Sequence, residues 1–292
     1  MGTRCFALIT GASRGFGKSV AEELVRKLAP LQALDVILVA RSAEGLEGTA
    51  ASIKSIAVGL GRPENVCVRQ ESVDLADVEG LEDRLSSLFA DIDPTKYSRA
   101  VLVNNAASIG HIGRSNDQMS LRALKEYMDL NVTSCIWITS RFAQLFGAHG
   151  PAKSQVVEYK DRKQQPTAEA TGGDDGSEGD RPFSECNSVV VHVSSLVALQ
   201  PIKYYANYSA GKAARDMFHK VLALEQAEIG GLKVLNYAPG PMDTDMGAEV
   251  RNSECPMSST YVDVDETAKK CVRLAFADNW EPGEHIDYFD DK

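Results

Sequence analysis

The fold class follows from residues 5–17, whose sequence is CFALITGASRGFG. The continuous apolar run at residues 5–9 is typical of a buried parallel strand. After the glycines, apolar residues recur at helical spacing at Val20, Ala21, Leu24, Val25 and Leu28. Glycines in a turn between a strand and a helix let a pyrophosphate approach the backbone at the helix N-terminus. The stretch therefore predicts a nucleotide-binding unit of strand, glycine turn and helix.

Strand-like and helical patterns alternate along the rest of the chain. Further strands are expected at residues 35–40, 66–68, 100–103, 188–193, 232–237 and 285–289. Helical patterns lie between them, and the longest covers residues 120–146. This alternation predicts a single α/β domain over residues 1–292, with a doubly wound, Rossmann-type parallel sheet of about seven strands flanked by helices. Ligands of such sheets bind at the carboxyl ends of the strands.

One segment interrupts the alternation. Residues 151–185 have few apolar side chains and include the run GGDDGSEGD at residues 172–180. Such a segment cannot bury enough apolar surface to offset the entropy cost of ordering. We expect it to be a disordered surface insertion between a helix and the fifth strand.

Composition narrows the class of protein. The 292 residues carry a net charge of −10, which argues against a nucleic-acid or anionic-membrane surface. No apolar run approaches the roughly 20 residues of a membrane span, and no signal peptide is visible. The six cysteines stand singly, and the five histidines lack metal-ligand spacing. We therefore expect a cytoplasmic protein with reduced thiols and without a metal site.

Tyr208 and Lys212 form a candidate acid–base pair. They are four residues apart in an expected helix, so their side chains share one face about one turn apart. The unperturbed pKa of tyrosine is about 10, and a nearby ammonium or an oxidised nicotinamide would lower it. The pattern YxxxK is common and usually has no catalytic meaning, so this interpretation depends on the other motifs.

Those motifs resemble the short-chain dehydrogenase/reductase family. The glycine turn has the spacing TGxxxGxG, and residues 104–107 (NNAA) differ from the family's NNAG only in the last residue. Residues 239–240 resemble the PG loop that covers the nicotinamide. The resemblance implies an oxidoreductase that transfers a hydride between a nicotinamide cofactor and a small carbonyl substrate. It also implies a homodimer paired through the helices that carry Asn131 and Tyr208.

The same resemblance assigns four catalytic positions. Tyr208 is expected to protonate the carbonyl oxygen during reduction, and Ser195 to hydrogen-bond that oxygen. Lys212 is expected to lower the pKa of Tyr208 and to hold the nicotinamide ribose, while Asn131 orders a relay water. Ser194 is adjacent to Ser195, but alternation in an extended segment points its side chain elsewhere.

The end of the second strand favours NADP(H) over NAD. In NAD-binding proteins of this fold an acid at that position binds the ribose hydroxyls, whereas here Arg41 follows the strand. Arg41 and Arg14 can both pair with a 2′-phosphate. The full set of expected cofactor-binding residues is Gly11, Ala12, Ser13, Arg14, Gly15, Phe16, Gly17, Arg41, Ser42, Asp74, Leu75, Asn105, Lys212, Met242, Asp243, Thr244, Asp245 and Met246.

Several stretches resemble the family members that reduce a pterin side-chain carbonyl in tetrahydrobiopterin synthesis. They are residues 195–201 (SLVALQP), 210–217 (AGKAARDM) and 234–246 (VLNYAPGPMDTDM). In those enzymes an aspartate near the C-terminus anchors the amino-pyrimidine ring, and Asp287 occupies the matching position. A carboxylate can accept two hydrogen bonds from such an edge. The implied substrate-binding residues are Ser195, Leu196, Tyr208, Gly240 and Asp287.

Two alternatives stay open. A related carbonyl reductase would act on diketones or other small carbonyls, and Asp287 should matter little to it. A non-catalytic NADP-binding sensor would typically lack the tyrosine or the lysine, and both are present here. Residues 247–264 should form the lid over the substrate, and they differ from the pterin-reducing members, which leaves the substrate range open.

Overall fold

The computed structural model of the chain describes residues 4–30, 32–117, 120–147, 187–227, 229–255, 260–277 and 279–292. These residues contain one seven-stranded sheet with the order β3-β2-β1-β4-β5-β6-β7 and parallel pairing throughout. The strands are β1 (Arg4–Thr10), β2 (Ala33–Ala40), β3 (Val66–Ser72), β4 (Arg99–Asn104), β5 (Asn187–Val193), β6 (Leu232–Ala238) and β7 (His285–Asp287). The predicted doubly wound sheet is confirmed. The expected insertion at residues 151–185 lies outside the described residues.

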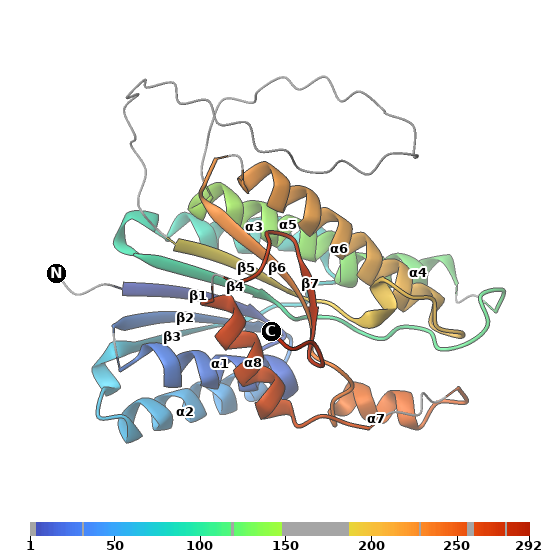
Figure 1. The fold of residues 1–292 in the computed structure, drawn as a ribbon, viewed down its shortest axis with the longest axis horizontal. Helices are drawn as coiled ribbons and strands as arrows, with labels where there is room; N and C mark the ends of the chain where they lie inside the picture. Colours follow the sequence, from blue (N-terminus) through green and yellow to red (C-terminus); the bar gives the residue numbers. More distant parts are fainter. Residues whose placement is uncertain are drawn as a thin grey trace.

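Helices cover both faces of the sheet (Figure 1). One face carries α1 (Gly15–Leu28), α2 (Ala43–Gly59) and α8 (Val264–Ala275) over one apolar core. The other carries α3 (Val78–Ala90), α5 (Ser134–Phe146) and α6 (Ala206–Ala227) over a second core. The central strands are buried on both faces, which is why they appear in the sequence as continuous apolar runs. The remaining elements are η1 (Pro63–Asn65), η2 (Pro94–Lys96), α4 (Leu121–Met128), η3 (Asp129–Thr133), η4 (Leu196–Ala198) and α7 (Asp245–Arg251).

The helix expected over residues 120–146 is divided in the structure. A π-helical turn, η3, separates α4 from α5 and contains Asn131. The Asn131 amide donates to the Tyr127 carbonyl at 2.9 Å, and the Ser134 hydroxyl donates to the Leu130 carbonyl at 2.7 Å. Side chains that bond backbone carbonyls four residues back disturb the helix, and π-turns of this kind often lie at functional sites.

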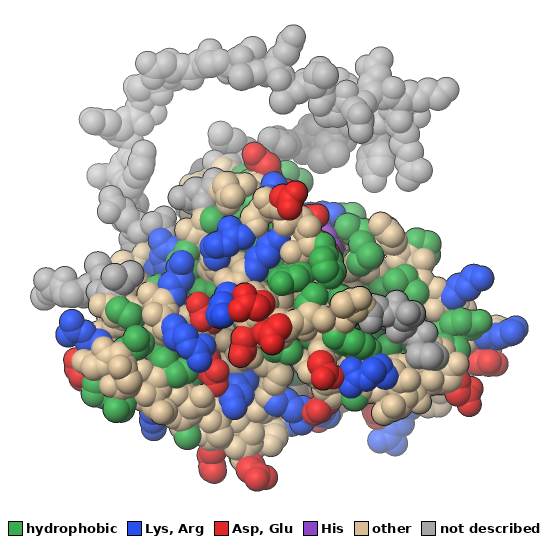
Figure 2. All heavy atoms as spheres, turned by 60° about the horizontal axis from the view of Figure 1, so that its bottom comes forward, with side chains coloured by type: hydrophobic (Ala, Val, Ile, Leu, Met, Phe, Trp, Pro, Cys, Tyr) green, Lys and Arg blue, Asp and Glu red, His purple; other side chains and the backbone are tan. Residues whose placement is uncertain are grey.

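Acidic and basic side chains both lie on the described surface. On the face shown in Figure 2, Lys and Arg side chains are interspersed with Asp and Glu, so the described residues form no continuous basic stripe there. None of the helices in the described ranges combines the length and the apolar content that a membrane crossing requires. The most exposed large apolar side chains of α6 are Met217 and Leu224, at 61% and 69%.

Candidate active site

A pocket of about 1630 Å³ opens at the carboxyl ends of the strands. Its walls come from the glycine turn after β1, the ends of β4, β5 and β6, helix α6, helix α7 and the C-terminal turn after β7. This is the edge at which open α/β sheets bind their ligands, because the loops there converge from both faces of the sheet. The pocket is therefore the candidate active site.

The glycine turn forms a cradle at one end of the pocket. Gly11 has a φ of +66°, and a Cβ there would lie 2.7 Å from the Asn105 amide nitrogen. A Cβ on Gly17 would lie 2.3 Å from the Gly11 carbonyl oxygen, so only glycine allows this close packing. Helix α1 begins at Gly15 without a side-chain cap from Arg14. Its first N–H groups are free to bind an anion, as a cofactor pyrophosphate requires.

Most of the predicted cofactor residues line this pocket, and three do not. The Ala12 carbonyl accepts a hydrogen bond from Thr49 at 2.9 Å, Gly17 packs against Gly11, and the Asp74 carboxylate accepts the Ala76 N–H at 3.0 Å. The predicted residues that line it are Gly11, Ser13, Arg14, Gly15, Phe16, Arg41, Ser42, Leu75, Asn105, Lys212, Met242, Asp243, Thr244, Asp245 and Met246.

Arg14 has an acidic partner across the pocket. Its Nε lies 2.7 Å from Asp245 Oδ2, and both side chains are largely exposed. The pair joins the glycine turn to the first residue of α7. Exposed ion pairs contribute little free energy, so an entering phosphate can compete with Asp245 for the guanidinium.

Three of the four predicted catalytic residues lie together in the pocket. Ser195 hydrogen-bonds Tyr208, and Lys212 Nζ lies 5.5 Å from the Tyr208 ring centroid. Lys212 also donates to the Val193 carbonyl at 2.7 Å, which ties α6 to the end of β5. Asn131 is buried behind the pocket, where its Oδ1 accepts the Ser108 N–H at 3.0 Å.

The electrostatics of this pair differ from the expectation. Burial raises the pKa of Tyr208 to about 12, although the charge of Arg215 and the hydrogen bond with Ser195 oppose the rise. Burial also lowers the pKa of Lys212 to about 7; Arg215 adds to this decrease, and Asp216 opposes it. Arg215 is the cation whose charge opposes the rise at Tyr208. The expected effect of Lys212 on the pKa of Tyr208 stays a prediction.

A buried polar row crosses the sheet beneath the catalytic residues. Asn104, His192, Asn236 and His285 are register partners on β4, β5, β6 and β7. The first three are at most 1% exposed, and the His285 side chain is 8% exposed. His192 and Asn236 are single polar residues inside apolar runs, Asn104 begins a polar pair and His285 follows Glu284, so no shared pattern in the sequence indicates the row. Only the strand order and register bring the four side chains together.

Asp216 on α6 connects this row to the pocket. It accepts the Ser194 hydroxyl at 2.5 Å and lies 2.7 Å from His285 Nδ1 and 3.2 Å from His192 Nε2. Burial by itself would raise the pKa of Asp216, but the nearby His192 ring and the hydrogen bonds from His285 and Ser194 hold it well below its usual range. The Ser194 hydroxyl is thus engaged by Asp216, and the assignment of Ser195 as the serine that contacts the substrate stays a prediction.

Arg215 fixes the neighbouring edge of the pocket. Its guanidinium donates to the Asn104 carbonyl at 2.9 Å and to the Ala106 carbonyl at 3.1 Å. The side chain is 1% exposed, so this cation keeps its place and its charge beside the catalytic helix. Sequence reasoning missed Arg215 and Asp216, although both lie on the face of α6 that begins with Tyr208 and Lys212.

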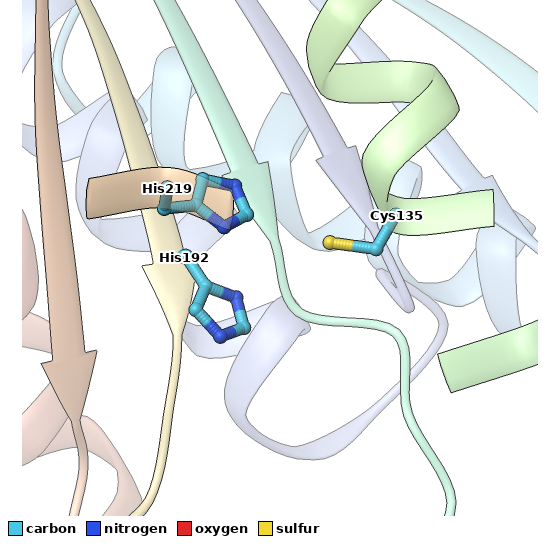
Figure 3. A group of neighbouring side chains, drawn as sticks. All are labelled: Cys135, His192 and His219. Carbon is cyan, nitrogen blue, oxygen red and sulfur yellow. The ribbon is translucent and has the colours of Figure 1, made fainter. Parts of the chain in front are cut away.

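One cluster resembles a metal site in composition only. Cys135 on α5, His192 on β5 and His219 on α6 have ligand atoms within 4.8 Å of one another (Figure 3). The two imidazole rings stack with an interplanar angle of 6° and centroids 4.6 Å apart. A shared ion would need to lie near the plane of both rings, at about 2.0–2.1 Å from each nitrogen, and parallel stacked planes do not meet. His219 also has partners for both nitrogens, the Arg215 carbonyl and the Thr139 hydroxyl. We interpret the cluster as polar core.

The predicted substrate residues all line the same pocket as Tyr208. Leu196 lies in η4 directly after Ser195, and Gly240 adopts a φ of +76° in the loop after β6. A Cβ at Gly240 would lie 3.5 Å from the Phe289 ring, so this loop contacts the C-terminal turn. Asp287 stands at the end of β7, half-buried, and lines the pocket.

Comparison with known families agrees with this arrangement. The family model for short chain dehydrogenase matches residues 6–157 and 184–254. The chain belongs to the short-chain dehydrogenase family. The match includes the glycine turn, Tyr208 and Lys212, and it omits residues 158–183, which fall within the expected insertion.

The curated relatives of this chain include sepiapterin reductases. The enzyme of Xenopus tropicalis is 33% identical over 97% of this chain and 95% of its own length. The enzyme of Mus musculus is 31% identical over 97% and 96% of the two chains. A benzil reductase of Bacillus subtilis is 27% identical over 84% of this chain and 78% of its own length. The chain is thus an oxidoreductase that acts on carbonyl or CH–OH groups.

Solved structures support the same fold. An actinorhodin polyketide ketoreductase variant with NADPH has a TM-score of 0.67 at 22% identity, with 99% and 97% of the two chains covered. A 3-oxoacyl-[acyl-carrier protein] reductase from Brucella melitensis in complex with NAD has a TM-score of 0.65 at 21% identity, with 98% and 95% covered. The short-chain dehydrogenase fold binds a nicotinamide cofactor, and these two structures carry different forms of it.

Proposed function

We propose that this protein reduces the side-chain carbonyl of a pterin, of the sepiapterin or 6-pyruvoyl-tetrahydropterin type, with NADPH, as in tetrahydrobiopterin biosynthesis. One observation carries the proposal: Asp287 lies in the same pocket as Ser195 and Tyr208. A carboxylate at one end can hold an amino-pyrimidine edge while the hydroxyls at the other end hold the carbonyl. The similarity to sepiapterin reductases over nearly the whole chain supports it. The cytoplasmic location expected from the sequence belongs to the same proposal.

In this proposal the chain positions the carbonyl and supplies the proton. The Ser195 hydroxyl donates to the carbonyl oxygen and stabilises the charge that develops there. Tyr208 stays protonated at neutral pH, because burial raises its pKa to about 12, and gives its proton to that oxygen. Lys212 binds the cofactor ribose, and Asn131 holds the relay that returns a proton from solvent. When bound, the nicotinamide supplies the hydride.

A general diketone reductase is the second candidate, and the resemblance to a benzil reductase favours it. The test is NADPH oxidation by the purified protein with sepiapterin and with a diketone, for wild type and Asp287→Ala. The pterin proposal expects sepiapterin turnover that collapses in the variant while diketone turnover is kept. Diketone turnover without sepiapterin turnover would move the function to general carbonyl reduction. Absence of turnover with either substrate would favour the non-catalytic sensor.

We also propose NADP(H) as the cofactor. Arg14 and Arg41 both line the adenosine end of the pocket, and no acid follows β2. Replacing Arg41 with Asp should lower the NADPH to NADH preference by about tenfold or more, because a bidentate phosphate contact is exchanged for repulsion. The matched control is Arg26→Asp, an exposed position on α1. An unchanged preference in Arg41→Asp would contradict the assignment.

A homodimer through α5 and α6 is the proposed assembly. Met217, Val221 and Leu224 leave an apolar strip exposed on α6, at 61%, 46% and 69%. A shallow groove of about 290 Å³ between α5 and α6 lies beside this strip. Leu224→Lys should shift the sedimentation coefficient from dimer to monomer, whereas Leu121→Lys on α4, 82% exposed, should not. Wild-type monomers at micromolar concentration would rule the dimer out.

A further inference from the structure

The turn that carries Asp287 is closed by its own hydrogen bonds. The Asp290 carboxylate accepts the Asp287 N–H at 2.7 Å, and the Asp290 N–H donates to the Asp287 carbonyl at 3.1 Å. The Phe289 N–H donates to the Asp287 carboxylate at 3.0 Å, and the Tyr288 N–H donates to the Ala238 carbonyl at 2.8 Å. The N–H groups of residues 287, 289 and 290 thus bond within the turn, and that of Tyr288 ties it to β6, so any further tie must use the carbonyls.

One side chain from another element binds these carbonyls. Lys270 Nζ on α8 donates to the Tyr288 carbonyl at 2.9 Å, to the Asp287 carbonyl at 3.3 Å and to the Asp290 carbonyl. An ammonium has three N–H donors, so the turn uses all of them. The Lys270 charge also faces the carboxylates of Asp287, Asp290 and Asp291.

The other cations of α8 do not make these contacts. Lys269, the preceding residue, is exposed and pairs with Glu266. Arg273, one turn further, donates to the carbonyl of Lys292, beyond the turn. Helix α8 packs on α1, which begins at the glycine turn. Lys270 therefore links the substrate-anchor end of the pocket to the framework of the cofactor end.

We propose that Lys270 is a positioning residue for substrate choice. By holding the carbonyls of Asp287, Tyr288 and Asp290 it sets where the Asp287 carboxylate stands in the pocket. This inference rests on the proposed pterin function, because only a substrate that contacts Asp287 senses the position of the turn. Ser195 follows β5 and Tyr208 lies on α6, and Lys270 makes its hydrogen bonds to the turn and to neither of these residues. The reaction with a substrate that does not reach Asp287 should therefore be little affected by Lys270.

The test compares Lys270→Met with Lys270→Arg in the full-length protein, with Lys269→Met and Arg273→Met as matched controls on the same helix. Steady-state kinetics with NADPH are measured for sepiapterin and for a diketone. Lys270→Met should raise the KM for sepiapterin about tenfold, with kcat little changed, because ground-state and transition-state binding weaken equally. Diketone kinetics should stay within about twofold of wild type, and Lys270→Arg should recover part of the KM.

A double-mutant cycle tests whether Lys270 acts through Asp287. In an Asp287→Ala background, Lys270→Met should add little to the sepiapterin KM, because both changes remove the same interaction. An unchanged sepiapterin KM in Lys270→Met would overturn the proposal. So would equal losses with both substrates, which would indicate a general structural role, or full additivity with Asp287→Ala. If wild type does not reduce sepiapterin, or if Asp287→Ala alone has no effect, the proposed function itself has failed; this outcome is recognised without any Lys270 variant.

Discussion

The two ends of the pocket are built in different ways. At the catalytic end, the helix of Tyr208 carries polar side chains that are almost fully buried, such as Asp216 at 2% and Arg215 at 1% exposed. At the anchor end, Asp287 is half-buried and Phe289 is 65% exposed, and the turn is held by backbone bonds and Lys270. In the proposed function, the chemistry is thus embedded in the core that stabilises the fold, whereas substrate choice depends on a peripheral turn. A change at the anchor end should alter specificity without unfolding the protein, and a change at the catalytic end should affect every substrate.

The largest expected effect tests whether the catalytic end is shared by all substrates. Tyr208→Phe should lower kcat for sepiapterin and for a diketone alike, by about 10²-fold or more, because the proton donor is removed. Steady-state NADPH oxidation measures both. The binding of NADPH, followed by fluorescence, should persist in the variant. Near-normal turnover of either substrate would break the assignment of Tyr208 as the common acid.

The next largest effect tests what Asp216, the partner of the buried polar row, contributes to turnover. Asp216→Asn should lower kcat/KM by about tenfold for both substrates, because an acceptor shared by Ser194 and His285 is lost. Asp216 also raises the pKa of Lys212, which is about 7. If the Lys212 ammonium is the active form, kcat/KM for NADPH falls as pH rises through about 7 in wild type, and it should fall at lower pH in the variant. Glu225→Gln, on the exposed face of α6, is the control. An effect on sepiapterin alone would contradict the division between the two ends.

A pH effect on stability is expected from two buried histidines, His192 of the polar row and His219, which stacks on it. Burial lowers the pKa of His219 to about 4, against 6.5 when unfolded, and burial lowers that of His192 well below its ordinary value. At pH values between about 4 and 6.5, the unfolded state binds more protons than the folded state. The free energy of unfolding therefore falls as the pH falls below about 6.5. Each histidine contributes up to about 1.4 kcal/mol per pH unit. Urea unfolding at pH 7, 6 and 5 measures the slope, and His219→Gln should reduce it. A flat profile would show that these histidines are not held neutral.

The smallest expected effect concerns residues 247–264, the segment expected to form the lid over the substrate. The Tyr205 hydroxyl donates to the Cys255 carbonyl at 2.8 Å, and its ring packs with Val250 of α7. Tyr205→Phe keeps the packing and removes one hydrogen bond, so KM for sepiapterin should rise by only about two- to fivefold. Tyr204→Phe, at a neighbouring partly exposed ring, is the comparison. A larger rise in the sepiapterin KM than in Lys270→Met would place substrate choice on the lid instead of the C-terminal turn.

Local patterns explain how much could be predicted. The glycine turn, the apolar strands and the pair Tyr208 and Lys212 are each encoded within a short stretch, so their identity follows from spacing and periodicity. The expected positions of Ser195 and Asp287 in one pocket also follow, because carboxyl ends of parallel strands meet at one edge. The π-turn at Asn131 could not be foreseen, since it depends on hydrogen bonds from Asn131 and Ser134 that compete with the helix.

The sequence by itself determined the fold class, the family and the residue types at the reacting end of the pocket. The tertiary structure decided their environment: that Asn104, His192, Asn236 and His285 share one row, that Asp216 and Arg215 face it, and that Lys270 reaches the turn of Asp287. The physical reason is the separation in sequence between the residues that interact. Strand and turn identity depends on neighbours in the chain, whereas burial, register and charge pairing depend on residues that are distant in sequence. The same distinction explains why the pKa values of Tyr208 and Lys212 differ from those expected of an isolated helical pair.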